Sequence, residues 1–307
     1  MAPSKEYEPG LQYVSTNTPL DDIYHLMKRD GAVGIRKLVP TDVLDQTYEE
    51  IKERIINDEP WEGSFFPRET KRAPSLIARS PLYTKSQMMN PIFQAVCDHF
   101  LTTKSTFYWG DELKESVSKP QISSAVAIEI GPGGKAQPLH RDSYIHHTDN
   151  EAVGAWDDRR DRTRVPSLGL SVAGCEVTKE NGGTQLILGS HLWKTVDKPP
   201  NPANAITPEL EKGDALLMLS NVYHGGGNNT TDQPRLMYFT FAIRGYLRQE
   251  ENQYLAVPKD VMKNYDRETQ AFSGYYISEP AAGWLEEVDP YYALYPEKMK
   301  DVKMTDF

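Results

Sequence analysis

Three residues of this sequence have the types and the order of a metal-binding set. They are His140 and Asp142, separated by one residue, and the more distant His224. Two imidazoles and one carboxylate can occupy one face of an octahedron around ferrous iron and leave the opposite positions open. A His-x-Asp triplet alone is weak evidence, because roughly one such chain in three contains one by chance. The context supports the prediction, since each histidine lies near the end of a predicted strand and glycines 225–227 follow His224, where backbone can pass close to a site.

Three further residues are predicted to complete such a site. Arg235 opens the predicted strand that follows His224, and its planar guanidinium can form two parallel hydrogen bonds to a carboxylate. If 2-oxoglutarate chelates the iron through its keto and C1 carboxylate oxygens, Arg235 is expected to bind the far carboxylate. Gln137 is predicted to donate a hydrogen bond to the C1 carboxylate, and Thr184 to add a hydroxyl donor from a facing strand. These residue types together predict a non-haem iron oxygenase that uses Fe(II), 2-oxoglutarate and O2.

The elements that must position these residues are predicted from residue 121 onward, where apolar and polar residues alternate with the period of a strand. Gly- and Asn-rich clusters separate the alternating segments and predict turns. A mainly β protein with flanking helices, built as a β-sandwich or jelly roll, is therefore expected. The predicted strands are Ser123–Ile130, Ser167–Val177, Thr184–Leu188, Ala215–Leu219 and Leu236–Ile243.

The sequence before residue 121 predicts helices instead. The first helix is expected to begin with Thr18 as its N-cap and to stop at Gly31, because these residue types favour the two ends of a helix. Apolar residues recur on one face of a second helix, Thr41–Asn57, and of a third, Pro91–Leu101. Residues 61–84, between the last two helices, are predicted to be irregular and too long to be a passive connector.

These elements predict a single domain over residues 1–307. Its parts are a helical N-terminal buttress at about 12–110, a jelly-roll core at about 121–248 and a C-terminal arm at about 250–307. The charged run Asp157–Arg164 is expected to form a solvated, self-paired loop.

Composition limits the classes of partner and compartment. The 307-residue chain has a formal net charge of −10 and a sequence pI of about 5.3, which disfavours nucleic-acid binding. No stretch approaches the ~18 apolar residues of a membrane helix, and the polar first ten residues lack the apolar region of a secretion signal. Only Cys97 and Cys175 are present, which is typical of a reducing compartment. We therefore expect a cytoplasmic protein.

Several longer segments resemble the phytanoyl-CoA hydroxylase-like family, in particular its fungal secondary-metabolism branch of alkaloid and meroterpenoid dioxygenases. The resemblance covers most of residues 12–275 and implies a double-stranded β-helix (cupin-like), Fe(II), 2-oxoglutarate, a hydrophobic small-molecule substrate and often a homodimer. It also implies that His140, Asp142 and His224 bind the iron and that Arg235 anchors the cosubstrate. The segments are Ala136-Gln-Pro-Leu-His-Arg-Asp142, Glu180-Asn-Gly-Gly-Thr-Gln-Leu-Ile-Leu-Gly-Ser-His-Leu-Trp193, Gly213-Asp-Ala-Leu-Leu217, Tyr223-His-Gly-Gly-Gly-Asn228 and Leu255-Ala-Val-Pro258.

Two other classes of protein remain open. A cupin-like metalloenzyme that works without 2-oxoglutarate would need more histidines around its metal and no arginine at position 235. A non-catalytic jelly-roll binding protein would not need Asp142, His224 and Arg235 together. For the predicted 2-oxoglutarate-dependent oxygenase, the outcome could be hydroxylation, desaturation, rearrangement or endoperoxidation, because that choice depends on how the substrate is placed.

Residues outside the metal set receive weaker predictions. Phe66 and Ile77, before the predicted core, and Tyr144, just after the triplet, are candidate substrate contacts. His146 and His147 are expected to be solvated loop residues, and His191 is expected to brace a turn.

Overall fold

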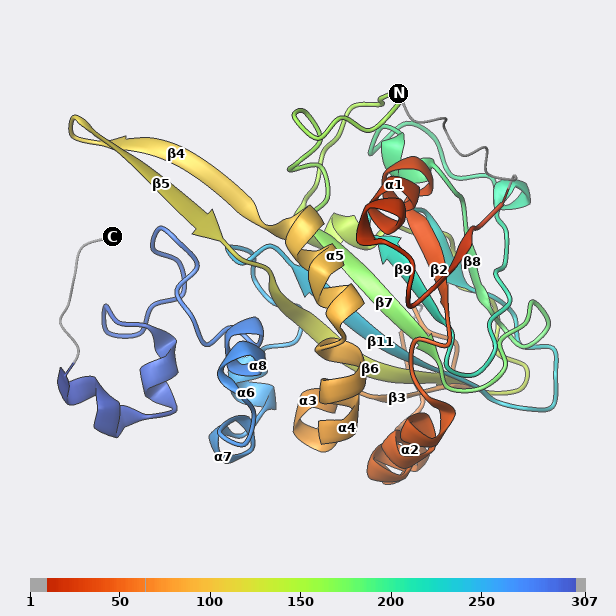
Figure 1. Ribbon diagram of the computed structural model, residues 1–307. Coiled ribbons are helices and arrows are strands. Elements are labelled where there is room, and N and C mark those ends of the chain that lie inside the picture. The colour runs from red at the N-terminus through yellow and green to blue at the C-terminus, as the bar shows by residue number, and fades with distance from the viewer. Residues whose placement is uncertain (1–9, 64, 302–307) are drawn as a thin grey trace.

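The computed structural model describes residues 10–63 and 65–301, and its centre is a seven-stranded sheet (Figure 1). The edge pair β1–β2 is parallel, and every other neighbouring pair is antiparallel. In sheet order the strands are β1 (Tyr13–Ser15), β2 (Ala32–Arg36), β9 (Ala215–Leu219), β7 (Ser167–Ala173), β11 (Arg235–Ile243), β6 (Gln121–Ile130) and β3 (Thr70–Ala73).

A second, two-stranded sheet completes a jelly roll. It pairs β8 (Thr184–Leu186) with β10 (His224–Gly226) in antiparallel register. Residues of both sheets line one common cavity. The expected mainly β architecture with flanking helices is therefore confirmed, although the smaller sheet is short.

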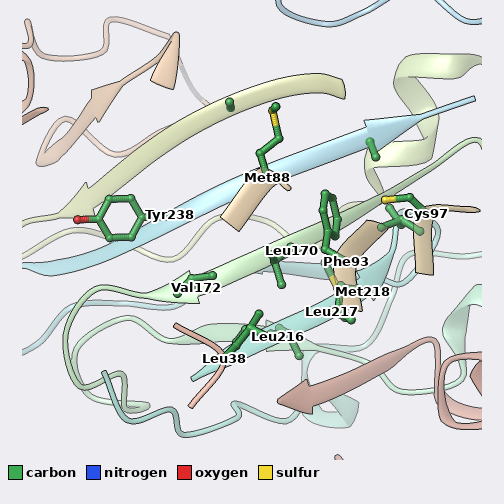
Figure 2. Packing of buried hydrophobic residues seen from close by; sticks show 14 of the residues in the cluster. Leu38, Met88, Phe93, Cys97, Leu170, Val172, Leu216, Leu217, Met218 and Tyr238 are labelled. Atoms are coloured by element: carbon green, nitrogen blue, oxygen red, sulfur yellow. The ribbon is translucent and has the colours of Figure 1, made fainter. Parts of the chain in front are cut away.

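Alternation along the strands separates the core from the cavity, because successive side chains of a strand point to opposite faces. In β7, Leu168, Leu170 and Val172 belong to the hydrophobic core, whereas Ser167, Gly169 and Ser171 line the cavity. Figure 2 shows Leu170 and Val172 in the core cluster, which also contains Phe93 and Cys97 of the helix α5 (Pro91–Leu101). The face of β7 toward the helices is therefore apolar, and its face toward the cavity is lined by small or polar residues.

The helices cover the apolar face of the large sheet, as α1 and α5 do in Figure 1. The longer ones are α1 (Leu20–Asp30), α2 (Thr41–Ile56) and α5 (Pro91–Leu101), so the second and third predicted helices are confirmed. Short helices precede and follow the sheet: α3 (Leu76–Arg79), α4 (Pro81–Tyr83), the π-helix Thr84–Met88, α6 (Gln253–Ala256), α7 (Lys259–Met262) and α8 (Arg267–Phe272). Single 3-10 turns lie at Asp142–His146, Ser190–Leu192, Pro202–Asn204, Pro290–Ala293 and Pro296–Asp301. No helix of the described residues is both long and apolar enough to span a membrane.

The ends of α1 agree only in part with the prediction. Gly31 terminates the helix in the left-handed conformation with φ of 80°, as expected. The N-cap, however, is Pro19, and no side chain caps this end. The Thr18 hydroxyl instead accepts a hydrogen bond from the backbone N–H of Ser15 at 3.1 Å, so it closes the turn before the helix.

Two predictions for the region before residue 121 are wrong. Residues 61–84 are not wholly irregular, since β3, α3 and α4 lie within them. A β-hairpin, β4 (Thr103–Trp109) with β5 (Glu112–Ser118), also follows the helical buttress and was missed. The hairpin projects from the body of the molecule (Figure 1) and exposes Tyr108, Trp109 and Leu113 by 61–70%. Its side chains alternate along two strands instead of recurring along one helix face, so helical periodicity does not reveal the hairpin.

The charged run Asp157–Arg164 is self-paired, but the prediction of a wholly solvated loop is wrong. Arg160 pairs with Asp161, whose side chain is buried with Arg164. The Arg164 guanidinium donates to the backbone carbonyls of Glu151, His191, Leu192 and Trp193. These carbonyls compensate the loss of water around the buried cation, so the arginine joins two loops.

Candidate metal centre

His140, Asp142 and His224 come together in the cavity, as the sequence predicts. Their ligand atoms lie within 4.8 Å of one another. The Nε2 atom of His140 is 3.6 Å from one carboxylate oxygen of Asp142, and Nε2 of His224 is 3.5 Å from the other. Both imidazoles therefore face the same carboxylate, which is the donor set that ferrous iron accepts.

The second nitrogen of each ring is bonded to backbone. Nδ1 of His140 lies 2.9 Å from the carbonyl of Pro138, and Nδ1 of His224 lies 3.1 Å from that of Val222. A carbonyl only accepts, so each Nδ1 carries the proton and each Nε2 presents its lone pair to the site. Desolvation, followed by the neighbouring His224, lowers the pKa of His140, which favours the neutral form that binds a metal.

The strand ends that carry the histidines are not those expected. His224 does not end β9 but begins the short strand β10, and His140 forms an isolated bridge with it. Glycines after His224 are needed here, since a Cβ on Gly227 would lie 2.8 Å from the Gly183 carbonyl oxygen. The prediction of close backbone approach at this glycine run is confirmed.

Arg235 is buried at the start of β11 with a relative exposure of 1%. Its Nη2 donates to the Gly182 carbonyl at 2.6 Å, whereas its Nε and Nη1 have no partner among the described residues. Desolvation lowers the pKa of Arg235 to about 10. A buried cation that lines a cavity and has unused N–H donors is a site that an anion can complete.

Gln137 and Thr184 also line the cavity, but the Gln137 amide already has partners. Its Oε1 accepts from the Gly226 N–H at 3.0 Å, and its Nε2 donates to the Phe65 carbonyl at 3.1 Å. In this structure, therefore, Gln137 joins the loop before β3 to β10 rather than pointing a free donor at a ligand. Thr184 lies in β8 opposite Gly226, on the facing strand that the sequence predicts.

The cavity has a volume of about 360 Å³ and contains both Arg235 and the His-Asp-His set. One wall is aromatic, and the edge of Phe65 contacts the His140 ring at a centroid distance of 5.2 Å. Other walls are polar. The aromatic lining residues are Trp61, Phe65, Phe66, Tyr144, Phe239 and Phe241, and the acidic and hydroxyl-bearing ones, apart from Asp142, are Thr70, Ser123, Ser124, Ser167, Ser171, Thr184, Ser220 and Glu250.

Two of the three predicted substrate contacts reach this cavity and one does not. Phe66 and Tyr144 line it. Ile77 lies in α3 with an exposure of 0% and is part of the hydrophobic core, so its prediction as a substrate contact is corrected. An apolar residue in a short helix is hidden once that helix packs on the sheet. Glu250, just after the last large strand, was missed because no local pattern marks it.

The remaining histidines occupy three different places. His146 lines the cavity, which the sequence did not predict, and His147 is exposed. His191 is buried and its Nε2 bonds the Lys28 carbonyl at 3.0 Å, so it braces the loop onto α1. Of the described residues, only the set of His140, Asp142 and His224 gathers three metal-binding groups in this way.

The residues present fit a ferrous ion and a dicarboxylate. Two neutral imidazole nitrogens and a carboxylate converge, while in the same cavity Nε and Nη1 of Arg235 have no hydrogen-bond partner among the described residues. A buried, half-satisfied guanidinium costs free energy unless a ligand completes its hydrogen bonds.

Solved structures share this fold. The chain matches the non-haem α-ketoglutarate-dependent epimerase SnoN from nogalamycin biosynthesis with a TM-score of 0.54 and 16% identity, over 77% of this chain and 88% of that one. It matches HygX from Streptomyces hygroscopicus, solved with nickel and 2-oxoglutarate, with a TM-score of 0.54 and 14% identity, over 74% and 88%. At these identities the likeness establishes the jelly-roll fold.

Sequence comparison adds the family. The chain is 33% identical to the dioxygenase himG of Aspergillus japonicus, over 93% of this chain and 90% of the relative. It is 34% identical to the dioxygenase cnsJ of Penicillium expansum, over 86% and 79%. The model of the phytanoyl-CoA dioxygenase (PhyH) family matches residues 27–237, which span the metal-binding set and Arg235. With more than half of its length matched, the chain belongs to the phytanoyl-CoA dioxygenase family.

Proposed function

We propose that this chain is an Fe(II)- and 2-oxoglutarate-dependent dioxygenase that oxidises a small molecule in natural-product biosynthesis. The observation that carries the proposal is the convergence of His140, Asp142 and His224 in a cavity that also holds the half-satisfied Arg235. Membership of the phytanoyl-CoA dioxygenase family and relatives named dioxygenases support it. SnoN, which shares this fold, comes from nogalamycin biosynthesis.

The chain's own residues would each have a defined task. His140, Asp142 and His224 would hold the metal, with the carbonyls of Pro138 and Val222 fixing both ring orientations. Arg235 would bind the far carboxylate of the cosubstrate, and Thr184 would offer a hydroxyl beside it. The chemistry of this set would be activation of dioxygen, with electrons supplied by ferrous iron and by 2-oxoglutarate, which would leave as succinate and carbon dioxide.

The aromatic wall would receive the apolar part of the substrate. Phe65 and Phe66 pack edge to face at a centroid distance of 4.8 Å, and Trp61 packs against Phe66 at 5.6 Å. These rings come from the loop that Gln137 ties to β10. Closing an apolar loop over a cavity keeps water from the reacting centre. We extend the proposal to a substrate with a hydrophobic body.

Each of the two rival classes of protein leaves one feature of the cavity unexplained. A cupin-like metalloenzyme without a cosubstrate has no use for the free Nε and Nη1 atoms of Arg235. A non-catalytic binding protein has no use for two neutral imidazoles that face one carboxylate. Both features follow from a metal and a dicarboxylate bound together.

The test is release of succinate from 2-oxoglutarate by the purified, ferrous-loaded protein. Wild type is compared with His140→Ala and His224→Ala at equal concentration. Wild type should form succinate and the variants should not. Equal succinate formation by all three would refute the proposal, as would wild-type protein that binds no iron. A homodimer and a cytoplasmic location remain proposals, the latter supported by two free cysteines.

A further inference from the structure

The two ends of the cavity carry opposite charges. Arg235 begins β11 opposite Ile130 of β6, and Phe241 lies near the other end of β11, opposite Ser124. Six residues of strand separate these positions by about 20 Å. Ser124 in turn donates a hydrogen bond to Oε2 of Glu250 at 3.1 Å. A cation thus marks one end of the cavity and a carboxylate marks the other.

Glu250 is fixed at its end by the backbone around it. Its N–H donates to the Ser123 hydroxyl at 3.2 Å, and the next N–H, that of Glu251, donates to the Ser123 carbonyl at 3.0 Å. These bonds hold residues 250 and 251 alongside β6. The carboxylate of Glu250 therefore enters the cavity from a loop segment whose backbone is bonded to β6.

The neighbouring carboxylate shows what a purely structural role looks like. Glu251 accepts hydrogen bonds from the Ser75 hydroxyl at 2.6 Å and from the Gln253 amide at 3.0 Å. Both of its oxygens are thus used inside the protein. Oε1 of Glu250, by contrast, has no hydrogen bond to a described residue, and its side chain is accessible and lines the cavity.

No cation of the described residues pairs with Glu250. The charged groups that act on it are the carboxylates of Asp142 and Glu251, which repel it. Desolvation by the surrounding protein raises the pKa of Glu250; the hydrogen bond from Ser124 lowers it in part, and the two carboxylates raise it again. A carboxylate whose charged neighbours are all carboxylates is stabilised when a ligand brings a positive charge.

The surroundings of Glu250 suit a nitrogen cation. The Ser220 side chain lines the cavity with 4% exposure, and its Oγ has no partner among the described residues. Phe239 and Phe241 line it as well, with parallel rings 6.0 Å apart. Hydroxyl oxygens accept from N–H donors, and aromatic faces attract cations.

We propose that Glu250 is the specificity-determining residue that binds a protonated amine of the substrate. This inference deepens the proposed function and rests on it, because the bound amine is taken to be part of the molecule that the dioxygenase oxidises. Ser124 positions the carboxylate, and Ser220 offers a further acceptor. A neutral hydroxyl would form a hydrogen bond with Glu250 but would leave its charge uncompensated, so an amine is favoured. The positive Arg235 and the negative Glu250 then direct a dicarboxylate and an amine to different ends of one cavity.

The test measures binding without turnover. Two matched pairs of probes, tryptamine with tryptophol and cyclohexylmethylamine with cyclohexylmethanol, differ in bearing an ammonium or a hydroxyl group. They are titrated calorimetrically into the ferrous-loaded protein without oxygen. Wild type should bind each amine at least about tenfold more tightly than its alcohol. Glu250→Gln, which keeps the shape and removes the charge, should lose this preference and keep its affinity for the alcohols.

Two controls separate specificity from folding and from the proposed function. Glu115→Gln removes one exposed acid from the hairpin β4–β5 and should keep the amine preference. Affinity of Glu250→Gln for 2-oxoglutarate, measured in the same protein, should equal that of wild type, because Arg235 is unchanged. Absence of an amine preference in wild type, or its persistence in Glu250→Gln, overturns the inference. If the protein forms succinate but shows no preference for amines, only this inference is contradicted. If it prefers amines but forms no succinate, only the proposed oxidation is contradicted.

Discussion

The backbones of His140 and His224 bond to each other in both directions. The N–H of each donates to the carbonyl of the other, and both distances are 2.8 Å. Because these two bonds involve only main-chain atoms, they hold the backbone that carries the two imidazoles whatever the side chains bind. The geometry of the candidate metal centre is thus built into the fold before any metal arrives.

This bridge leads to a prediction for the ligand variants. His140→Ala should lose bound iron and succinate formation while the free energy of unfolding of the metal-free protein changes little, because the main-chain bonds remain. Metal analysis and urea denaturation of metal-free protein measure the two effects. His147→Asn, at an exposed position with φ of 53°, is the matched control, since asparagine tolerates this conformation. It should retain iron; equal iron loss in both variants would mean that the set is misassigned.

Arg235 should govern the requirement for cosubstrate. Arg235→Ala should raise the 2-oxoglutarate concentration for half-maximal succinate formation by about a hundredfold, or roughly 3 kcal/mol, because the buried carboxylate loses its partner. Arg235→Lys keeps the positive charge but loses the planar pair of N–H donors, so the rise in the 2-oxoglutarate requirement should be smaller than for Arg235→Ala. The measurement is a titration of 2-oxoglutarate with iron content checked in each protein.

The same arginine predicts a thermal shift that needs no turnover. At a hundredfold excess over its dissociation constant, 2-oxoglutarate should stabilise wild type by about 2.7 kcal/mol, and Arg235→Ala should lose most of this stabilisation. Arg159→Ala, which removes an exposed arginine, should keep it. An unchanged titration curve and thermal shift in Arg235→Ala would place the anchor elsewhere.

Gln137 should act through the loop before β3. Because its amide bridges the Phe65 carbonyl and the Gly226 N–H, Gln137→Ala should free both groups and speed amide exchange of Gly226. Gln137→Glu keeps the acceptor for Gly226 and loses the donor to Phe65, so Gly226 should stay protected while substrate affinity falls. Hydrogen exchange followed by mass spectrometry checks both variants. Protection of Gly226 in Gln137→Ala equal to that in wild type would contradict this role.

His191 should make the fold sensitive to acid. Burial lowers the pKa of His191 to about 4, and its Nδ1 has no acceptor among the described residues. Between the ordinary value of 6.5 and about 4, the unfolded chain binds a proton that the folded chain rejects, so stability falls as the pH falls through this window. The loss should approach roughly 3 kcal/mol. Urea denaturation at pH 7 and pH 4.5 should show a smaller pH-dependent loss for His191→Gln than for wild type. His147→Asn should keep the wild-type loss.

The sequence predicts the parts of the site that have a fixed chemical type and a local mark. His140 and Asp142 share one short segment, and Arg235 stands at the start of a clearly alternating strand. Long helices with one apolar face, such as α2 and α5, are also recognisable. Their bounds follow from proline, glycine and apolar spacing, all of which are local signals.

Residues whose role depends on distant neighbours escape such reasoning. Glu250 reaches the cavity because the backbone of residues 250 and 251 bonds to Ser123, more than a hundred positions earlier. The Glu251 carboxylate beside it bonds Ser75 and Gln253 instead. Ile77 is buried because α3 packs on the core, although its place before the predicted β core suggested a contact with the substrate. Gln137 is used by Phe65 and Gly226 rather than by a ligand. In each case, tertiary contacts rather than residue type decide the outcome.

The β4–β5 hairpin offers a practical handle on the molecule. Trp109 pairs with Glu112, so Gly110 and Asp111 alone form its tip, and Gly110 takes the positive φ of 65° that a tight turn needs. The tip is exposed and points away from the body (Figure 1), and such tips tolerate inserted sequence. A fluorescent label placed between residues 110 and 111 would therefore report rotational diffusion and self-association while leaving the catalytic chamber untouched.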